Sequence, residues 1–327
     1  MQQKNVEQNF EKLNNIVENL QTKENITYLE SLVITLEYAY SQTSSSELLQ
    51  DTIDYLNKTV KVVRLEELEK EEIRKIVQLA TLKGMRGATQ QQHLITPDTV
   101  AMFMGYIVNK IVGKKESIRI FDPAIGSANL LSSIINQLET NYEAYGSDVD
   151  TTLIQLGLVN ANFQKIKIDL FHQDSLQPFL LEPVDVVVSD LPVGYYPDDL
   201  RAKSYELRSD EGHSYAHHLF IEQSLHYTKE AGFLVFVVPN FLFNSDQSNK
   251  LHLYLQKHAH IVALLQLPNS IFTSEQQAKS ILILQKKGEG TMPPKQALIA
   301  QLPSFKNPNA TLQMVEKMNH WFKEEGF

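Results

Sequence analysis

The sequence predicts a doubly wound α/β sheet preceded by an all-α region. Apolar residues recur at helical spacing over roughly the first 85 positions. From about residue 90, short β-rich runs alternate with stretches long enough to hold crossover helices. One of these runs, 184–188, is almost continuously apolar, which is typical of a central strand buried on both faces. These three observations together favour a parallel sheet with helices on both sides.

Length and composition set the limits of this fold. The chain has 327 residues, enough for about two domains of ordinary size, and 43% of them are hydrophobic. It contains no cysteine, which excludes disulfides, thiolate zinc sites and cysteine nucleophiles. The N-terminus is polar, and no apolar run approaches the ~20 residues of a membrane helix. We therefore expect a cytoplasmic protein without a membrane partner.

The net charge is −9. Neutralisation of phosphates dominates nucleic-acid affinity, so free-standing DNA-binding proteins usually carry a basic excess. Here a basic footprint would have to be local, and each small group of this kind, taken alone, is more typical of ordinary solvated surface. The candidate groups are Lys83 with Arg86, and Arg201 with Lys203 and Arg208. The charge counts against tight, non-specific DNA binding.

Residues 1–88 are predicted to form a helical domain of up-and-down type. Thr43 and the three serines after it indicate a turn with an N-cap before Glu47, and Gly84 and Gly87 are expected to end the pattern. Apolar stripes at this spacing normally form core. They comprise Phe10, Leu13, Ile16, Val17 and Leu20; Leu29, Leu32, Val33, Leu36 and Tyr40; Leu48, Leu49, Ile53, Leu56 and Val60; and a last helix from near Leu65 through Ile73, Ile76 and Leu79.

Residues 89–290 are predicted to form the α/β domain, with seven strands. The expected strands are Ser117–Phe121, Tyr142–Gly146, Lys167–Phe171, Val184–Ser189, Gly232–Pro239, Ile261–Leu267 and Ser280–Lys286. Crossover-sized segments separate the first five, which predicts parallel pairing, whereas the short link Pro268–Lys279 permits an antiparallel end. Residues 291–327 are predicted to be a C-terminal extension with a short helix around Thr311–Phe322.

The segment Phe121–Leu130 runs from a strand through a turn of small residues into a helix. In doubly wound sheets, ligands bind outside the carboxyl ends of the strands. Small residues allow the backbone to approach a ligand closely, and Asp122 could hold a cationic or amino group. A tight turn without any ligand would explain this segment equally well if it stood alone.

Two further acids follow later strands. Asp148 lies just after the next run, where an acid can accept both hydroxyls of a ribose. The G-x-G-x-x-G signature of dinucleotide enzymes is absent, so a ligand without a pyrophosphate fits better. Asp174 follows the third run and could accept a hydrogen bond from an adenine amino group. A helix N-cap is the preferred interpretation of Asp174 from its own segment.

The fourth run ends in Ser189–Pro197, where Asp190 precedes a proline and glycine turn and two tyrosines. This arrangement suits a site that hydrogen-bonds an amino group and stacks a flat ring. The alternative is a proline-rich loop in which Tyr195 and Tyr196 are buried. The segment alone leaves both interpretations open.

Taken in order, these segments resemble the class I S-adenosylmethionine-dependent, adenine-specific N6 DNA methyltransferases. The likeness is strongest to the modification subunit of type I restriction systems and to the YtxK-like members. The family's Asp-Pro-Ala-Cys-Gly-Ser-Gly motif corresponds to Asp122–Ala128, and its Asn/Asp-Pro-Pro-aromatic motif corresponds to Asp190–Val193. Similar matches are His93–Pro97 to a Tyr-Thr-Pro segment, Asp148 and Asp174 to the ribose and adenine acids, Gly232–Asn240 to the fifth strand, and Leu267–Phe272 with Ala278–Leu284 to a late stretch of the modification subunits.

The resemblance spans roughly residues 90–287 and implies a Rossmann-like sheet of seven mostly parallel strands that binds S-adenosylmethionine. Asp190 and the carbonyl near Leu191 would hold a target amino group, so that catalysis is mainly positioning. A base in a duplex would be flipped into the pocket. The implied catalytic residues are Asp190, Leu191, Pro192, Tyr195 and Tyr196. The implied cofactor-binding residues are Thr96, Pro97, Asp122, Pro123, Ala124, Gly126, Ser127, Asn129, Leu130, Asp148, Val149, Asp174, Ser175 and Asp190, and no metal is implied.

The chain departs from the family pattern at several points. Ile125 replaces a cysteine and Ala128 a glycine, while Leu191 and Val193 replace a proline and the stacking aromatic. We expect Tyr195 or Tyr196 to face the space beside Asp190 in its place. The segment after the catalytic domain is too short for a target-recognition domain.

Three hypotheses about function follow. The first is adenine-N6 methylation of DNA, as in restriction-modification systems, with DNA bound weakly or through a partner. The second is a cofactor-binding regulatory protein that has lost DNA methylation. The third is methylation of RNA or of a protein amide. The helical domain is expected to fold separately and to bind a partner, the substrate or a second copy of the chain.

Overall fold

The computed structural model describes residues 2–43, 47–86, 95–113, 115–272 and 274–326. Ser44–Ser46, Gly87, His93 and Leu94, to which the sequence assigned a turn, a helix end and a motif, lie outside these ranges. The α-helices are α1 (Gln2–Glu24), α2 (Tyr28–Ser41), α3 (Gln50–Thr59), α4 (Lys70–Met85), α5 (Asp98–Val112), α6 (Asn129–Ile135), α7 (Thr151–Gln164), α8 (Asp199–Ala202), α9 (Ala216–His226), α10 (Ser248–His258) and α11 (Pro308–Glu325). The strands are β1 (Ser117–Asp122), β2 (Asn141–Asp148), β3 (Asp169–His172), β4 (Val184–Asp190), β5 (Thr228–Pro239), β6 (Ala259–Gln266), β7 (Lys279–Lys286) and β8 (Leu298–Gln301).

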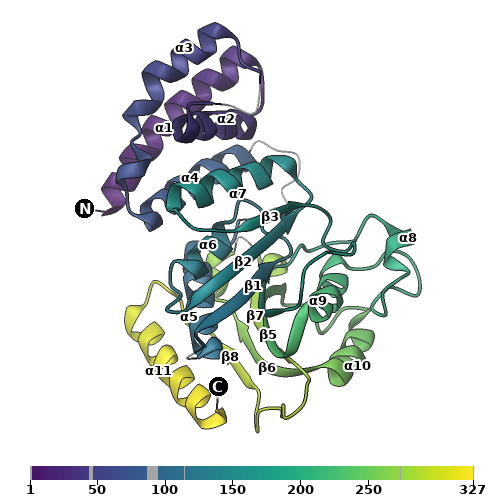
Figure 1. The fold of residues 1–327 in the computed structure, drawn as a ribbon. Helices are drawn as coiled ribbons and strands as arrows, with labels where there is room; N and C mark the ends of the chain where they lie inside the picture. The colour runs from purple at the N-terminus through teal and green to yellow at the C-terminus, as the bar shows by residue number, and fades with distance from the viewer. Residues whose placement is uncertain (1, 44–46, 87–94, 114, 273, 327) are drawn as a thin grey trace.

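The N-terminal helices α1 to α4 form one end of the molecule (Figure 1). Two of them begin at capping boxes, in which Thr27 pairs with Glu30 and Glu69 with Glu72. The last helix differs from expectation, because Leu65–Glu67 forms a 3-10 turn and α4 begins only at Lys70. α4 ends at Met85, one residue after Gly84, close to where the sequence placed the end of the helical pattern. A Cβ at Gly84 would lie 2.4 Å from Cδ2 of Leu29, so the glycine allows α2 and α4 to approach closely.

The sheet has the strand order β3-β2-β1-β4-β5-β7-β6-β8. The first five strands in the chain pair in parallel, and β7 lies antiparallel between β5 and β6, which confirms both predictions from the strand spacing. An eighth strand, β8, extends the expected seven by pairing in parallel with β6. Because β7 runs in the opposite direction, its first residue lies at the edge where the parallel strands end. Lys279 is paired there with Pro239, the last residue of β5.

Alternate residues of the central strands enter two different cores. Val235 and Val237 pack with α5, α6 and α11 on one face, and Leu234 and Phe236 pack with α9 and α10 on the other. Figure 1 shows α5 and α11 on one side of the sheet and α9 and α10 on the other. This doubly covered sheet is the predicted fold class.

The C-terminal segment belongs to the α/β fold. The Met318 and Phe322 side chains of α11 are buried in the core beside α5, and the Tyr106 hydroxyl donates to Asn319 Oδ1 at 3.0 Å. Trp321 Nε1 donates to the Gln296 carbonyl at 3.2 Å. Of the helices within the described ranges, none combines the length and apolarity needed to cross a bilayer.

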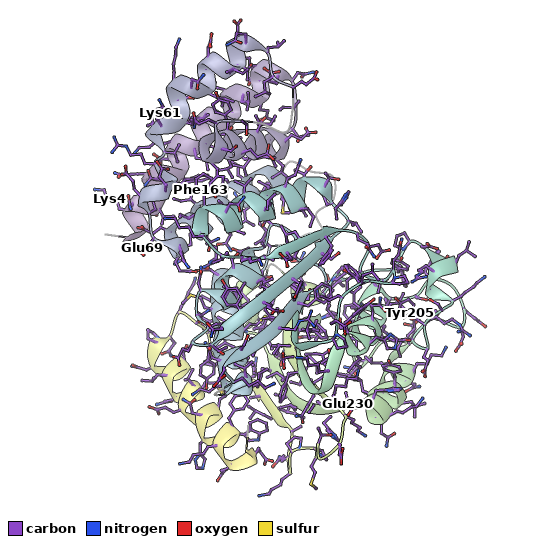
Figure 2. The ribbon with its side chains drawn as sticks, in the orientation of Figure 1. Lys4, Lys61, Glu69, Phe163, Tyr205 and Glu230 are labelled. Carbon is purple, nitrogen blue, oxygen red and sulfur yellow. The ribbon has the colours of Figure 1, made fainter. Side chains whose placement is uncertain are left out.

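The helical region and the sheet domain share a core through α7. Leu153, Leu156, Val159 and Phe163 of α7 belong to the same buried cluster as the apolar stripes of α1, α2 and α4. Figure 2 shows Phe163 in the layer between α7 and the N-terminal helices. This shared cluster bears on the expected separate folding of the helical domain, because it covers one face of α7 with residues of the helical region.

Candidate active site

The carboxyl ends of β1, β2 and β4, the loop after β3 and the start of β7 surround one cavity. It gathers nearly every residue that the sequence assigned to a site, the exceptions being Pro97, Tyr195 and Tyr196. The predicted residues that line it are Thr96, Asp122, Pro123, Ala124, Gly126, Ser127, Asn129, Leu130, Asp148, Val149, Asp174, Ser175, Asp190, Leu191 and Pro192. These residues span almost 100 positions of the sequence. The parallel topology brings them together, because it places the carboxyl ends of the parallel strands at one edge of the sheet.

The turn after β1 is built from left-handed backbone. Gly126 and Ala128 have φ of 54° and 60°. A Cβ on Gly126 would meet no atom within 4 Å, so this backbone is open towards the cavity that it lines. Ala128 adopts the conformation for which the family uses glycine, and its Cβ is fully buried. The turn therefore carries some backbone strain at Ala128.

Asp122 is almost completely buried at the end of β1. Its Oδ1 accepts hydrogen bonds from the Ala124 amide at 3.0 Å and from Ser189 Oγ at 2.8 Å. Burial raises the pKa of the Asp122 carboxyl to about 7, and the charges of Asp148 and Asp190 act in the same direction. A cation placed in the cavity would oppose this shift and favour the ionised form.

Asp148 and Asp174 both accept hydrogen bonds from backbone amides. Asp148 Oδ2 accepts from the Gly126 amide and its Oδ1 from the Asp150 amide, both at 2.9 Å. Asp174 Oδ1 accepts from the Leu176 amide at 2.9 Å, which is an Asx turn and not the helix N-cap favoured from the segment alone. Both carboxylates nevertheless line the cavity.

Asp190 is paired with a lysine to which the sequence gave no role. Lys279 Nζ lies 2.6 Å from Asp190 Oδ1, and Thr96 Oγ1 donates to Oδ2 at 3.0 Å. Lys279 belongs to the late stretch of the family resemblance, but only the antiparallel direction of β7 brings its side chain to the strand-end cavity. Among the lining residues that the structure describes, it is the one cationic side chain.

The two tyrosines after Asp190 lie elsewhere than expected. The Tyr196 hydroxyl donates to Asp174 Oδ2 at 2.5 Å, and its ring is buried. Tyr195 is 59% exposed and stacks on Tyr215, with ring centroids 5.0 Å apart and planes 12° apart. Neither ring lines the cavity beside Asp190, because Gly194 and Ala216 hydrogen-bond and the Tyr195–Tyr215 bridge ties this loop to the start of α9.

A pair of buried histidines lies behind this loop. The His217 ring stacks on Tyr215 with ring centroids 5.1 Å apart. The His218 ring lies edge-on to the His217 ring, with centroids 4.9 Å apart. None of their ring nitrogens has a hydrogen-bond partner among the residues that the structure describes. Burial lowers the pKa of His217 to about 3, assisted by His218 and Lys279, and burial lowers that of His218 to about 4. Both imidazoles are therefore neutral near pH 7.

Arg74 connects the helical region to the cavity, a role that the sequence did not reveal. Its guanidinium is fully buried, and Nη1 donates to Asn129 Oδ1 at 2.8 Å. The same guanidinium pairs with Glu71 of α4 and Asp98 of α5. Asn129 begins α6 and lines the cavity, so α4 helps to fix the wall of the site.

The family model for N-6 DNA methylases matches residues 84–324. The chain belongs to the N-6 DNA methylase family. A second model, the YtxK N-terminal helical domain, matches residues 7–85, which is the α1–α4 region. Both matches confirm the resemblance found in the motifs, and they make the chain a member of an S-adenosylmethionine-dependent methyltransferase family.

Individual relatives agree with this assignment. The chain is 45% identical over 328 residues to YtxK of Bacillus subtilis (strain 168), described as uncharacterized, covering 99% of this chain and 100% of that protein. A Listeria monocytogenes structure, described as a candidate class I S-adenosylmethionine-dependent methyltransferase, matches with TM-score 0.90 and 41% identity over 98% of this chain and 99% of its own. A type I methyltransferase subunit from Streptococcus thermophilus shares the fold, with TM-score 0.65 and 15% identity over 94% of this chain and 74% of its own.

The cavity suits S-adenosylmethionine chemically. This cofactor carries two positive groups, a sulfonium and an ammonium, and one negative group, a carboxylate. Its net charge is therefore positive. Within the described part of the chain, the cavity is lined by four carboxylates, those of Asp122, Asp148, Asp174 and Asp190, and by one cation, Lys279. The open backbone at Gly126 provides the space that a side chain would fill. Across the described ranges, no group of three or more His, Asp or Glu is placed to hold a metal ion.

Proposed function

We propose that this methyltransferase transfers a methyl group to the exocyclic N6 amino group of adenine in DNA. The observation that carries the proposal is Asp190, which ends β4 inside the cofactor cavity and is followed by Leu191 and Pro192. A strand-end carboxylate of this kind can accept an N–H of a planar amino group while leaving the nitrogen lone pair free. No other acid of the cavity is followed by the family's acceptor turn.

The chain's own groups would act by positioning. S-adenosylmethionine, when bound, supplies a methyl group that is already activated by the positive sulfur, so a strong base is not needed. Asp190 orients the amino group, and the Leu191 amide, which donates to the Val237 carbonyl at 3.1 Å, fixes the turn that follows. Asp122 and Asp148 add negative charge on the cofactor side.

The surface beside the cavity favours a weakly held or partner-assisted nucleic acid. The segment 193–215 contains five acidic residues and only three basic ones, so it lacks the excess of positive charge that a duplex requires. It does offer an exposed aromatic face, that of Tyr195 on Tyr215. Stacking of a base on such a ring contributes about 1–3 kcal/mol, which supports single-stranded or locally opened DNA as the substrate.

Transfer of a labelled methyl group tests the proposal. Purified protein is incubated with tritiated S-adenosylmethionine and with single-stranded or duplex DNA, and the digested nucleosides are separated. We expect label in N6-methyladenine. Asp190→Ala should lose this label, and Asp199→Ala, which removes an exposed carboxylate at the start of α8, should retain it.

A cofactor-binding protein without methyl transfer is the second candidate. The observation that favours it is the occupation of both Asp190 oxygens, by Lys279 and Thr96. Cofactor binding without label in DNA, RNA or protein would establish this role. Label in RNA or in a protein amide would instead identify that polymer, and not DNA, as the methyl acceptor.

A further inference from the structure

The ammonium of Lys279 makes the same kind of bond that an acceptor's amino group would make. It donates an N–H to Asp190 Oδ1 at 2.6 Å inside the cavity. The pair is largely shielded from water, with side-chain exposures of 17% for Lys279 and 13% for Asp190. An amino group that approaches Asp190 therefore meets a position that is already taken.

We infer that Lys279 competes with the acceptor for Asp190 and selects acceptors in which the amino group stands next to a hydrogen-bond-accepting atom. This inference rests on the proposed methyl transfer to an amino group. It assigns Lys279 a positioning and selecting role at the acceptor site.

The backbone of Lys279 is fixed, so only its side chain can give way. Its carbonyl accepts a hydrogen bond from the Leu267 amide at 3.0 Å, and the residue is paired with Pro239 across β5 and β7. The four-carbon stem of lysine is flexible and its ammonium donates in three directions. Lys279 can thus yield one lone pair of Asp190 without any change in the sheet.

A shielded ammonium that loses a bond needs a new acceptor, because an unpaired charge is costly away from water. Adenine offers one, since ring nitrogen N1 is bonded to the same carbon as the N6 amino group. An amino group of this type lets Asp190 and Lys279 bind the two atoms side by side. A simple alkylamine has no such atom and would leave Lys279 unsatisfied. The ion pair therefore favours amidine-like and amide-like edges.

Binding of modified adenines tests the pairing of Lys279 with N1. Single-stranded oligonucleotides carry one adenine, one 1-deazaadenine or one 7-deazaadenine at the same position. Affinity is measured by fluorescence anisotropy with S-adenosylhomocysteine present, so that no transfer occurs. Wild type should prefer adenine over 1-deazaadenine by about tenfold, as expected for a charge-assisted hydrogen bond, and should tolerate 7-deazaadenine.

Lys279→Met should bind the adenine oligonucleotide more tightly than wild type and should prefer adenine over 1-deazaadenine by less than about twofold. Lys279→Gln, which keeps the size and polarity, is the second variant if the methionine form is unstable. The control is Lys229→Met, which removes a similar ion pair with Asp185, at 2.9 Å, at the opposite end of β4 and β5. It should behave as wild type.

The inference is overturned if Lys279→Met keeps the wild-type preference for adenine over 1-deazaadenine. It is also overturned if wild type binds the two oligonucleotides equally well. Where turnover occurs, the same comparison applies to the ratio of kcat/KM, and Lys279→Met should lower KM for the adenine substrate. Methyl transfer without discrimination at N1 would overturn the role of Lys279 and leave the proposed function unaffected. Discrimination at N1 in binding without any methyl transfer would support the role of Lys279 and contradict the proposed function.

Discussion

At the scale of single residues, the burial of Asp122 links proton binding to folding. The pKa of this carboxyl rises from 3.8 to about 7 in the folded chain, because burial disfavours its charge. A carboxyl with a raised folded pKa contributes stability that is fully present below its unfolded pKa. This contribution is lost as the pH rises towards about 7.

We expect Asp122→Asn to remove this pH dependence. The amide oxygen can still accept from Ala124 and Ser189, and no charge has to be buried. Relative to wild type, the variant should gain stability between pH 4 and 7 by up to about 4 kcal/mol. Urea midpoints at several pH values measure this gain. Parallel profiles for wild type and variant would contradict it, and the exposed Asp199→Asn serves as the control.

Ala128 carries backbone strain that glycine would relieve. Its φ of 60° is a left-handed conformation, which costs an alanine about 1 kcal/mol or slightly more. Ala128→Gly should therefore stabilise the protein, by somewhat less than this because a buried methyl group is lost. Ala231 has the same φ but is exposed, so Ala231→Gly should give the full gain. Denaturant unfolding of the two variants separates strain from burial, and a loss of stability in both would refute the strain argument.

The acids of the site could be predicted from the sequence because each lies within three residues of the end of a β-rich run. Asp122, Asp148 and Asp190 end their strands, and parallel strands place such ends together. Lys279 was not predicted, because its position depends on the direction of β7 and on its pairing with β5. The strand spacing permitted an antiparallel strand but did not show which strand it would pair with. The orientations of Tyr195 and Tyr196 depend on the contact with α9, which no local pattern shows.

At the scale of elements, the Arg74 link between α4 and α6 is the feature with the clearest energetic consequence. Arg74→Met would leave Asn129 Oδ1 without its donor and Asp98 without its buried partner. We expect a loss of about 2–4 kcal/mol and weaker cofactor binding, since Asn129 lines the cavity. Calorimetry and urea unfolding report the two effects.

The neighbouring Lys75 provides a matched control. Its Nζ lies 3.6 Å from the same Asp98, but the side chain is 41% exposed. Lys75→Met should cost less than about 0.5 kcal/mol and leave cofactor affinity unchanged. Equal effects from the two variants would show that burial of Arg74 is unimportant.

Strands and helices with strong periodicity were predicted to within a few residues, and the failures have physical causes. β8 was not predicted because it is only four residues long and lies in the segment that the sequence assigned to a C-terminal extension, and its residues are all partly or fully exposed at the edge of the sheet. α4 ends at Met85, one residue after Gly84, as the sequence led us to expect, and the missing Cβ of Gly84 also allows Leu29 of α2 to pack closely against α4.

At the scale of the whole molecule, the core shared by α7 and the helical region predicts that the two parts are not separable. A chain of residues 89–327 would expose Leu156, Phe163 and their neighbours on α7. We expect this fragment to aggregate and to lose cofactor binding, whereas the full chain stays monodisperse in size-exclusion chromatography. Leu156→Gln with Phe163→Gln in the fragment should restore solubility. A soluble, cofactor-binding fragment without these changes would disprove the shared core.

Trp321 is the only tryptophan of the chain, and it lies on α11, outside the residues that line the cavity. Its indole is anchored to the Gln296 carbonyl and packs edge-on against Phe322. Intrinsic emission excited at the tryptophan band will consequently follow the attachment of the C-terminal helix to the sheet. We expect tryptophan emission to stay unchanged when a ligand fills the site. Binding should therefore be measured with a labelled ligand or by calorimetry.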